Sequence, residues 1–401
     1  MRLSFKLFCR ETMEALKFFQ YDEGVVNSLR RVYGNELPSF LKSIREPGRR
    51  LYVRVNTLIW NTDEVIESLR NRGIKVFPDE NVEEAIFFPI EGPYEVPVEE
   101  GVVIVDKRTA ESVYLGSHVY APGVLKAVGK FRRNAPVTVV SPLLEPVGWG
   151  YLKINPKDIG KVRKGLAVEV EISRYKAPKV REFPEYSQGV LYEQSLPAMI
   201  ASKILDPQPG ELIVDMCAAP GGKASHIHQL TKGKARIIAF DHSRKRVVKM
   251  IREFRRMKVN IEVYLADSRY LHVDYPLLRG KVDKVLIDPP CSSFGVRPKL
   301  YDSKKYRDII DLGNYQIQFF KPAYELLRKG GVLVYSTCTV TLEENEEIIE
   351  EAISKYRFEP VKTIYGGLGS KGFSSYGKFF LRFHPHIHDV TGYFIAKLVK
   401  K

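Results

Sequence analysis

Residues 185–401 alternate between short apolar runs and longer amphipathic stretches, and this alternation constrains the fold more than any other feature of the chain. The stretches 221–231, 243–258 and 314–328 have the pattern of helices. Five apolar runs have the length of buried strands, and they are 212–217, 236–241, 262–267, 284–290 and 331–337. Strands that alternate with helices form a parallel sheet with right-handed crossovers. We therefore predict an α/β fold with a doubly wound sheet of the Rossmann type.

A turn of small residues follows the first of these strands. Residues 214–226 read VDMCAAPGGKASH, so a strand leads into the turn and a helix leads out of it. Such a turn brings bare backbone N–H groups close to a ligand. Gly221 and Gly222 permit close approach, and Ala218 and Ala219 leave volume. The spacing differs from GxGxxG, so a dinucleotide is not the first expectation.

Acidic residues stand at the ends of four successive strands. Asp215, Asp241, Asp267 and Asp288 would meet at the carboxyl edge of the sheet, where ligands bind in open α/β folds. Asp241 is placed to accept hydrogen bonds from a ribose diol, and Asp267 to meet an adenine amino group or the amine of a methionine. Any one acid alone could equally serve a turn or a helix cap. The set favours a ligand with a ribose, a base and a positive centre but no phosphate, which fits S-adenosylmethionine.

Two cysteines follow neighbouring strands at the same edge. Cys291 lies in DPPCSSFGVRP after the fourth strand, and Cys338 lies in YSTCTVTLEENE after the fifth. A lone buried cysteine is most often structural, but two cysteines in loops beside an acidic edge indicate catalysis. A thiolate that adds to carbon 6 of cytosine makes carbon 5 able to take a methyl group from a sulfonium. Asp288 can hold N3 or N4 of the base, and Lys223 supplies a cation close to the same ring.

The chain is basic, with a net charge of +15, which favours an anionic macromolecular partner such as RNA or DNA. Residues 243–258 hold eight basic residues and one Glu, and Val247, Val248, Ile251 and Phe254 form an apolar stripe there. The basic face suits RNA contact and an ordinary solvated surface equally. A short basic run, KFRR, would suit a phosphate clamp at 130–133.

Other features exclude several classes of protein. No apolar run reaches 18 residues and the N-terminus is too charged for a secretory signal, so we expect no membrane association. The four cysteines lack the spacing of a zinc site or a disulfide framework, which suits a reducing cytoplasm. His384, His386 and His388 alternate as on a strand, but no cysteine lies near them, so we expect no metal site.

The pattern of apolar, polar and turn residues divides the chain into three regions. Residues 1–92 mix helical patterns with a short strand pattern, which predicts a small α/β region. Residues 93–178 hold short β-type runs broken by Gly, Pro and Asn, which is typical of a small β-barrel or sandwich with one or two short helices. The catalytic domain would occupy 179–401. Its last apolar segments predict antiparallel strands at the edge of the sheet, and they are 362–365, 378–385 and 392–400.

Three segments closely resemble motifs of the Sun family of RNA cytosine-5 methyltransferases, namely DMCAAPGGK, IDPPCSSFG and YSTCTVTLEENE, and the resemblance covers residues 186–400. It implies that Cys338 is the nucleophile and that Cys291 assists release of the product, with Asp288 and Lys223 beside them. It assigns to S-adenosylmethionine the residues Cys217, Ala218, Ala219, Pro220, Gly221, Gly222, Lys223, Asp241, Arg246, Asp267 and Asp288.

Residues 93–178 are similar to a PUA domain, an RNA-binding β-barrel. A PUA domain ahead of the catalytic domain looks like the branch of the Sun family that modifies cytosine 72 of tRNA and reads the acceptor stem with its CCA end. The resemblance implies a tRNA cytosine-5 methyltransferase, and we expect it to be a cytoplasmic monomer. Two alternatives stay open: the same chemistry on ribosomal RNA, and an RNA-binding assembly factor that keeps the fold without the chemistry.

Overall fold

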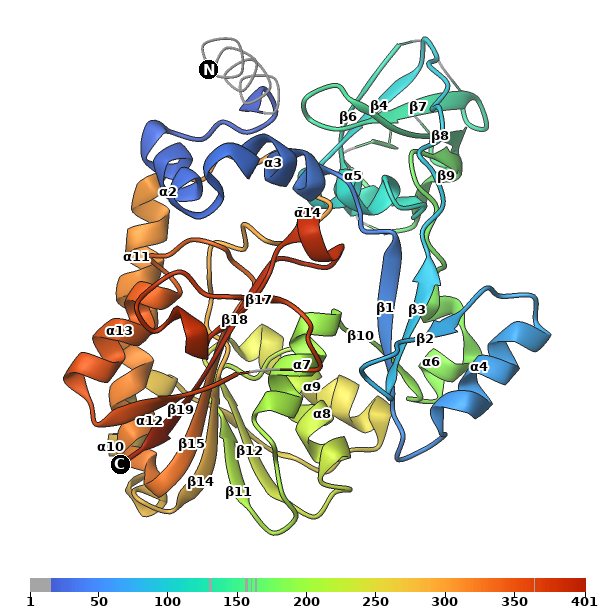
Figure 1. Ribbon diagram of the computed structural model, residues 1–401. Coiled ribbons are helices and arrows are strands. Elements are labelled where there is room, and N and C mark those ends of the chain that lie inside the picture. Colours follow the sequence, from blue (N-terminus) through green and yellow to red (C-terminus); the bar gives the residue numbers. More distant parts are fainter. Residues whose placement is uncertain (1–15, 130–131, 156–157, 160, 163, 364) are drawn as a thin grey trace.

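The structure is a computed structural model that describes residues 16–401 except 130, 131, 156, 157, 160, 163 and 364. Two sequence features fall outside the described residues: Cys9, and the first half of the KFRR run at 130–133. Within the described part of the chain the strands form three sheets, of nine, six and four strands. Figure 1 shows the nine-stranded sheet with its helices as one body, and the two smaller sheets beside it.

The nine-stranded sheet contains the five predicted strands, all parallel, in the order β13-β12-β11-β14-β15. They are β11 (Leu212–Asp215), β12 (Arg236–Asp241), β13 (Glu262–Leu265), β14 (Val282–Ile287) and β15 (Leu327–Thr337). The predicted doubly wound α/β fold is therefore confirmed. The strand order reverses between β11 and β14, and open sheets of this type bind their ligands beyond the carboxyl ends at such a point.

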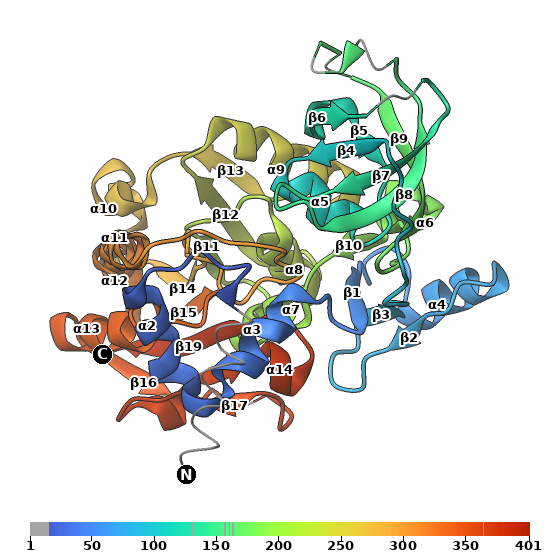
Figure 2. The ribbon, with the colours of Figure 1, turned by 90° about the horizontal axis from the view of Figure 1, so that it is seen from above.

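Helices cover both faces of this sheet because successive strand residues point to opposite sides. On one face Ile213 packs with α7 and α8, and α9 packs with Ala239 of β12. On the other face Val214 packs with α10, α12 and α13. Figure 2 shows the two groups on opposite sides of the strands. The helices are α7 (Leu196–Ile204), α8 (Gly222–Leu230), α9 (Arg244–Met257), α10 (Leu271–Asp274), α12 (Phe320–Leu326) and α13 (Glu346–Lys355).

The helix predicted at 314–328 begins earlier and is interrupted. Its first part is α11 (Tyr306–Gln316), which a short 3-10 helix (Ile317–Phe319) connects to α12. The tighter turn buries Phe319 against the sheet together with the first residue of α12. Side-chain packing thus divides one amphipathic stretch into two helices.

The C-terminal segment adds antiparallel strands, as predicted, but one of them lies inside the sheet. β19 (Tyr393–Lys400) runs between β15 and β18 (Leu381–Phe383), and β17 (Ser370–Lys371) follows at the edge. The strand expected at 362–365 lies earlier, as β16 (Phe358–Val361), which pairs with the far end of β19. The first residue of β16 is buried in the core, and its burial sets the position of the strand.

The six-stranded sheet comes from the region where a small β-barrel was predicted, and its strand order is β5-β9-β8-β7-β4-β6. Valine, alanine and leucine side chains fill its core. Leu300, from the loop after β14, is also buried in this core. The elements are β4 (Val102–Val105), α5 (Lys107–Val113), β5 (Val119–Tyr120), β6 (Val124–Val128), β7 (Pro136–Val140), β8 (Pro146–Leu152) and β9 (Leu166–Ser173).

The four-stranded sheet joins the N-terminal region to the segment that follows the six-stranded sheet. Its order is β10-β1-β3-β2, so the chain returns to pair β10 with β1 before it enters the nine-stranded sheet. Asn61 and Glu64 form a capping box that starts α4. The elements are β1 (Arg50–Val55), α4 (Thr62–Asn71), β2 (Phe77–Pro78), β3 (Ala85–Pro89) and β10 (Leu191–Glu193).

Two helices near the N-terminus lie over the carboxyl edge of the nine-stranded sheet (Figure 1). α2 (Glu23–Tyr33) and α3 (Leu37–Arg45) pack their apolar faces on Phe294 and Val340. These two side chains belong to the loops that follow β14 and β15. The N-terminal region therefore covers the two loops that carry the predicted catalytic cysteines.

Candidate active site

The four predicted strand-end acids lie along one edge of the nine-stranded sheet. Asp215 and Asp241 are the last residues of β11 and β12, and Asp288 directly follows β14. Asp267 comes shortly after β13 and caps a 3-10 helix by accepting a hydrogen bond from Arg269 N at 3.1 Å. The strand ends thus bring all four carboxylates to the carboxyl edge.

Lys223 and Asp288 form an ion pair in which Nζ lies 2.5 Å from Oδ2. The other oxygen of Asp288 accepts hydrogen bonds from Ser336 Oγ at 3.0 Å and from Tyr393 OH at 3.3 Å. Burial by itself lowers the pKa of Lys223, but the adjacent Asp288 carboxylate raises that pKa above its ordinary value. Lys223 therefore carries a positive charge at neutral pH, and both side chains are fixed in position.

The two predicted cysteines meet at this edge. Cys291 Sγ lies 3.4 Å from Cys338 Sγ, and Ser293 Oγ lies 3.4 Å from Cys338 Sγ. The hydrogen bond with Cys291 lowers the pKa of Cys338 and Ser293 lowers it further, although burial opposes both. The same Cys338 contact, together with burial, raises the pKa of Cys291. Cys338 is therefore the cysteine that ionises first, and Cys291 is the one that keeps its proton.

A buried carboxylate, Glu344, ties the two cysteine loops together. It accepts hydrogen bonds from Ser292 N at 2.8 Å, from Ser292 Oγ and from Thr341 Oγ1 at 2.9 Å. In addition, Gly295 N donates to Cys338 O at 3.1 Å, so the two loops are also joined through their backbones. The distance between the two sulfur atoms is thus set by a network that spans both loops.

The glycines of the small-residue turn have close protein neighbours. Gly221 has a φ of +105°, and a Cβ there would lie 2.5 Å from Phe254 Cε1 on α9. A Cβ on Gly222 would lie 2.9 Å from Tyr192 Cε1 on β10. Glycine is required here because α8 begins directly against these rings and because Gly221 is left-handed. The close approach that the sequence suggested for a ligand is thus made in part to aromatic side chains.

Two cavities follow the carboxyl edge and share Cys217 as a wall. The first, of about 160 Å³, is lined by the small-residue turn, the β10 segment and the Lys223–Asp288 pair. The second is lined by Asp241, Arg246 and Asp267. An elongated ligand with a polar tail at one end and a diol at the other fits this sequence of donors and acceptors.

Gln194 faces the first cavity with a free amide. The residue is 8% exposed, and neither Oε1 nor Nε2 has a hydrogen-bond partner within the described part of the chain. Buried polar atoms in native proteins almost always have partners. The amide can donate to a carboxylate and accept from an ammonium group, which are the two charged groups of an amino-acid tail.

Comparison with known proteins places the chain in a family. A profile for the 16S rRNA methyltransferases RsmB/F matches residues 202–399, and a PUA profile matches residues 101–173. The crystal structure of NSun6 from Pyrococcus horikoshii with SFG is 37% identical, has a TM-score of 0.88, and the match covers 95% of this chain and 98% of that one. The human 28S rRNA (cytosine(4447)-C(5))-methyltransferase is 34% identical over 54% of this chain and 28% of its own.

A further relative, the tRNA (cytosine(72)-C(5))-methyltransferase of Pyrococcus horikoshii, is 38% identical over 95% of this chain and 98% of its own. The chain belongs to the Sun family of RNA cytosine-C5 methyltransferases. The enzyme therefore depends on S-adenosylmethionine, and its six-stranded domain is a PUA domain, as predicted. SFG, present in the NSun6 crystal, is an analogue of that cofactor.

The acids of the second cavity differ in how freely they can bind a ligand in this Sun-family enzyme. Asp241 is 2% exposed and accepts a hydrogen bond from Ser243 N at 2.9 Å, with Arg246 Nη1 at 3.5 Å. Arg246 also donates to Ala219 O and so connects α9 to the small-residue turn. Asp267 is engaged by Arg269, whose Nη2 lies 2.6 Å from Oδ2.

Burial disfavours the charged forms of two further site residues. Burial raises the pKa of Asp215 to about 7, with Lys223 opposing the shift and Asp288 adding to it. Burial also raises the pKa of Cys217 well above its ordinary value, and Asp215 adds to this effect. Cys217 therefore stays a thiol, which separates its part in the cavity wall from the chemistry of Cys338.

Several residues of the site lie within or near the quoted motifs but were not singled out from the sequence. Ser336 and Tyr393 hold Asp288, Glu344 and Ser293 hold the cysteine loops, and Gln194 lines the cofactor cavity. Ser336, Glu344 and Ser293 each stand within five residues of a predicted cysteine or strand-end acid or inside its motif, which is the signal that could have found them. Tyr393 and Gln194 come from β19 and the β10 segment, and no local pattern marks them.

The buried face of the basic helix and the backbone conformation of the histidine segment both differ from what the sequence predicted. On α9 the buried residues are Val247, Met250, Phe254 and Met257, whereas Val248 is exposed. The three histidines do not lie on a strand, because His384 caps a short helix, α14 (Pro385–His388), that contains the other two. Among the described residues no cluster of His, Cys, Asp and Glu could hold a metal ion, and no helix there is long and apolar enough to cross a membrane.

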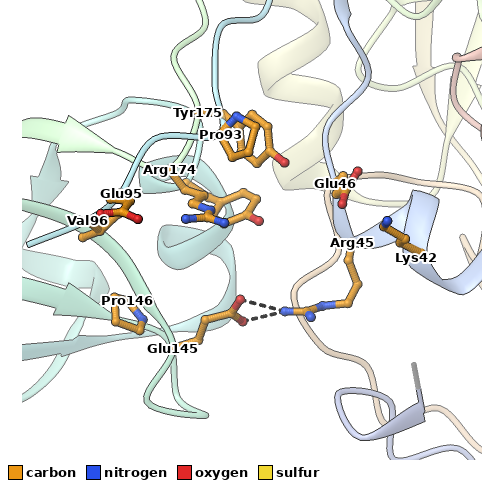
Figure 3. Close-up of a pocket in the computed structure, with 11 residues that line it drawn as sticks. Lys42, Arg45, Glu46, Pro93, Glu95, Val96, Glu145, Pro146, Arg174 and Tyr175 are labelled. Atoms are coloured by element: carbon orange, nitrogen blue, oxygen red, sulfur yellow. Dashed lines mark hydrogen bonds and ion pairs between the residues drawn. The ribbon is translucent and has the colours of Figure 1, made fainter. Parts of the chain in front are cut away.

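A separate pocket of about 560 Å³ lies between α3 and the PUA domain (Figure 3). Arg45 of α3 pairs across it with Glu145 at 2.7 Å. Its other walls include Lys42, Arg174 and Tyr175. None of the predicted catalytic or cofactor residues lines this pocket, so it is distinct from the methyltransferase site.

Proposed function

We propose that this enzyme transfers a methyl group from S-adenosylmethionine to carbon 5 of cytosine 72 in the acceptor stem of tRNA, through a covalent bond between Cys338 Sγ and carbon 6 of the base. The observation that carries the proposal is the cysteine pair. Cys338 Sγ lies 3.4 Å from Cys291 Sγ, and its lowered pKa makes it the nucleophile of the pair.

Attack by the Cys338 thiolate forms the Sγ–C6 bond and moves the electrons of the C5–C6 double bond toward carbon 5. The ring then carries negative charge, which the Lys223 ammonium group can stabilise. We assign Asp288 to holding the base, because its carboxylate can accept a hydrogen bond from the N4 amino group and because Ser336, Tyr393 and Lys223 fix it at the edge of the site. Lys223 supplies the compensating positive charge.

Release of the methylated base breaks the bond between Cys338 Sγ and carbon 6. After carbon 5 has gained its methyl group, its proton must leave, the C5–C6 double bond forms again and the electron pair of the Sγ–C6 bond returns to Cys338. We assign assistance in this step to Cys291, which is the immediate neighbour of the nucleophile. Its raised pKa keeps the proton on Cys291 during the attack, so its thiol can protonate Cys338 Sγ as that sulfur leaves carbon 6, while water takes the proton from carbon 5.

The cofactor supplies an electrophilic methyl group on a sulfonium. We assign its methionine part to the cavity beside Gln194 and the turn from Cys217 to Lys223, and its ribose and adenine to the cavity lined by Asp241, Arg246 and Asp267. The free amide of Gln194 and the Cys217 wall that the two cavities share support this direction of binding.

The choice of tRNA rests on the relatives and on the PUA domain. The Pyrococcus horikoshii relative matches nearly the whole chain, including the PUA domain, whereas the human 28S rRNA enzyme matches only 54% of it. In the proposal residues 1–92 form an RNA-recognition region, the PUA domain in 93–178 holds the CCA end, and 179–401 catalyse the reaction. The enzyme would act as a monomer in the cytoplasm.

Methylation of transcripts tests the target. Purified enzyme with S-adenosylmethionine should convert cytosine 72 of tRNA transcripts to 5-methylcytosine, as bisulfite sequencing reports, and a transcript with uridine at 72 should stay unmodified. Ribosomal RNA transcripts serve as the competing substrate. Modification of ribosomal RNA alone would assign the enzyme to the other branch of its family. No transfer to any RNA would favour the assembly factor.

A trapping experiment tests the covalent step. Carbon 5 of 5-fluorocytosine carries fluorine in place of the proton that release removes, so the Sγ–C6 bond cannot break after methyl transfer. The enzyme and a tRNA with 5-fluorocytosine at 72 should give a complex that survives denaturing electrophoresis when S-adenosylmethionine is present. Absence of this complex with active enzyme would contradict the mechanism.

A further inference from the structure

The loop after β14 runs from the active site into the PUA domain. It leaves Cys291 and Ser293, and Leu300 then enters the core of the PUA domain, where it is 1% exposed. Leu300 N donates a hydrogen bond to Glu111 Oε1 on α5 at 3.2 Å. A catalytic-domain loop is therefore built into a domain whose expected role is to bind RNA.

A buried carboxylate, Asp302, fixes the same loop by charge. It is 5% exposed, and its oxygens lie 3.0 Å from Lys299 Nζ, 3.1 Å from Lys304 Nζ and 3.7 Å from Lys107 Nζ. Tyr21 OH also donates to it at 3.3 Å. Burial opposes ionisation, but the lysines lower the pKa of Asp302 to about 2. Because Lys107 belongs to α5 of the PUA domain, the PUA domain supplies part of this anchor.

Lys299 connects Asp302 to Ser293, the residue that lies beside Cys338. Lys299 Nζ also donates to Ser293 O at 2.9 Å, and Lys299 N donates to Ile44 O at the end of α3 at 2.7 Å. Ser293 has a φ of +58°, a left-handed conformation that costs energy in a non-glycine residue and persists only where neighbours hold it. The Oγ of this residue is the one that lies 3.4 Å from Cys338 Sγ.

We propose that the segment from Lys299 to Asp302 is a strut through which the PUA domain holds Ser293 against Cys338. Lys107 and Glu111 of the PUA domain are then positioning residues for methyl transfer, in addition to any contact that the domain makes with RNA. The inference rests on the proposed function in one respect, namely that Cys338 is the nucleophile. The reactivity of this thiol can nevertheless be measured without RNA and without methyl transfer.

Alkylation of Cys338 by iodoacetamide in the RNA-free, full-length enzyme tests the strut. The thiolate displaces iodide, so the rate at each pH reports how much thiolate is present and how well it is exposed to the reagent. Mass spectrometry of the Cys338 peptide separates this thiol from the others. The variants are Lys107→Met and Glu111→Gln, with Ser293→Ala to remove the last contact and Lys107→Arg to restore the charge.

We expect the Lys107→Met and Glu111→Gln variants to alkylate about tenfold more slowly at pH 7, with the pH midpoint moved upward, as in Ser293→Ala. Lys107→Arg should behave as the wild type. The matched control is Lys126→Met, because Lys126 is an exposed lysine on β6 of the same domain. It should leave the alkylation profile unchanged even if it weakens tRNA binding.

Two outcomes would overturn the strut. In one, Ser293→Ala shifts the profile but the two PUA variants do not, so that Ser293 is held without the PUA domain. In the other, Ser293→Ala has no effect, so that this residue does not control how much Cys338 thiolate is present.

A methylation assay gives a second test. The strut predicts that saturating tRNA does not restore kcat in Lys107→Met, whereas a role of Lys107 in RNA contact alone predicts that it does. An enzyme that methylates no RNA would contradict the proposed function and leave the alkylation result intact.

Discussion

At the scale of single residues, Cys338 and Cys291 have the same chemistry but different surroundings. Ser293 Oγ lies 3.4 Å from Cys338 Sγ and 3.8 Å from Cys291 Sγ. We expect Cys338→Ala to lose both methylation and trapping, because no thiolate adds to the base. Cys291→Ala should accumulate a protein–RNA adduct, because release is impaired. Denaturing electrophoresis after incubation with tRNA and S-adenosylmethionine distinguishes them, and the reverse pattern would mean that the two roles are exchanged.

The raised pKa of Asp215 predicts how the stability of the protein changes with pH. Burial raises its pKa from 3.8 to about 7, so the folded state holds the proton more tightly than the unfolded chain does. The free energy of unfolding should then fall as pH rises from 4 to 7, by about 3 kcal/mol from this group. Asp215→Asn lacks the ionisation and should not show that loss. Urea unfolding of the cofactor-free protein at several pH values measures the difference.

The control for this experiment is Asp63→Asn, at an exposed position in the first turn of α4. The wild type and this control should share one pH profile, from which Asp215→Asn departs increasingly above pH 4. Parallel profiles for all three proteins would mean that Asp215 ionises normally in the folded state. Below pH 4 the three should converge, because both states are then protonated at Asp215.

The strand-end acids and the two cysteines could be found from the sequence because parallel strands end at one edge. Each needs only a local pattern, an apolar run followed by an Asp or Cys. Gln194 and Tyr393 could not be found in this way. They reach the site through β10, which pairs with β1, and through β19, which enters beside β15. Both pairings join segments far apart in the chain, and no periodicity records them.

At the scale of elements, the site depends on two loops that Glu344 joins. Glu344→Ala would leave Ser292 N and Oγ without their acceptor, and a buried unsatisfied group costs about 1–3 kcal/mol. We expect lower thermal stability and a kcat reduced about a hundredfold, because the sulfur atoms lose their fixed separation. The KM for S-adenosylmethionine should stay within about twofold, because Glu344 lines neither cofactor cavity. Steady-state kinetics and thermal unfolding measure these effects.

Glu67→Ala on the exposed face of α4 is the matched control for Glu344→Ala, and it should change neither kcat nor stability. Glu344→Gln keeps the shape but replaces one acceptor oxygen by an NH₂ group, so it should fall between the wild type and Glu344→Ala. A rise in the KM for S-adenosylmethionine with unchanged kcat would show that Glu344 supports the cofactor cavity instead of the cysteine loops.

The elements themselves were predictable to different extents. All five parallel strands overlap the predicted apolar runs, although β15 begins earlier, at Leu327. The inner strands are largely buried, as expected for such runs, whereas the edge strand β13 is partly exposed. The interrupted α11–α12 helix and the shifted strand β16 depend on which aromatic side chains reach the core, and a single amphipathic pattern does not specify this. The glycine turn was found from composition, but its protein neighbours, Phe254 and Tyr192, come from α9 and β10.

At the scale of the whole molecule, three regions of the chain meet around one pair of loops. The N-terminal helices α2 and α3 cover these loops, the PUA domain accepts Leu300 from one of them, and the nine-stranded sheet supplies both. The residue pattern along the chain suggested three regions. It could not show that all three contact the cysteine loops, because these contacts join segments far apart in the sequence. Those contacts join the PUA domain and the N-terminal helices to the loops that carry the two cysteines.

The net charge of the molecule gives a final prediction about RNA binding, at the basic helix α9. Arg246 and Arg256 are engaged with backbone carbonyls, whereas Arg244, Lys245 and Lys249 are exposed near the start of the helix. α9 follows β12, so these three side chains lie toward the edge that carries the site. The sequence left RNA contact and a solvated face equally open, and this placement favours RNA contact.

Reversing the three charges to Glu should raise the KM for tRNA at least about tenfold at low salt and reduce the salt slope of binding by about 3, because each contact with a phosphate releases counterions. The KM for S-adenosylmethionine should not change, because none of the three lines a cofactor cavity. The control reverses Lys234, Lys281 and Lys329, which are exposed at the opposite, amino edge of the sheet. Steady-state kinetics at several salt concentrations should separate the two variants. If both weaken tRNA binding equally, the effect comes from net charge alone and α9 is a solvated face.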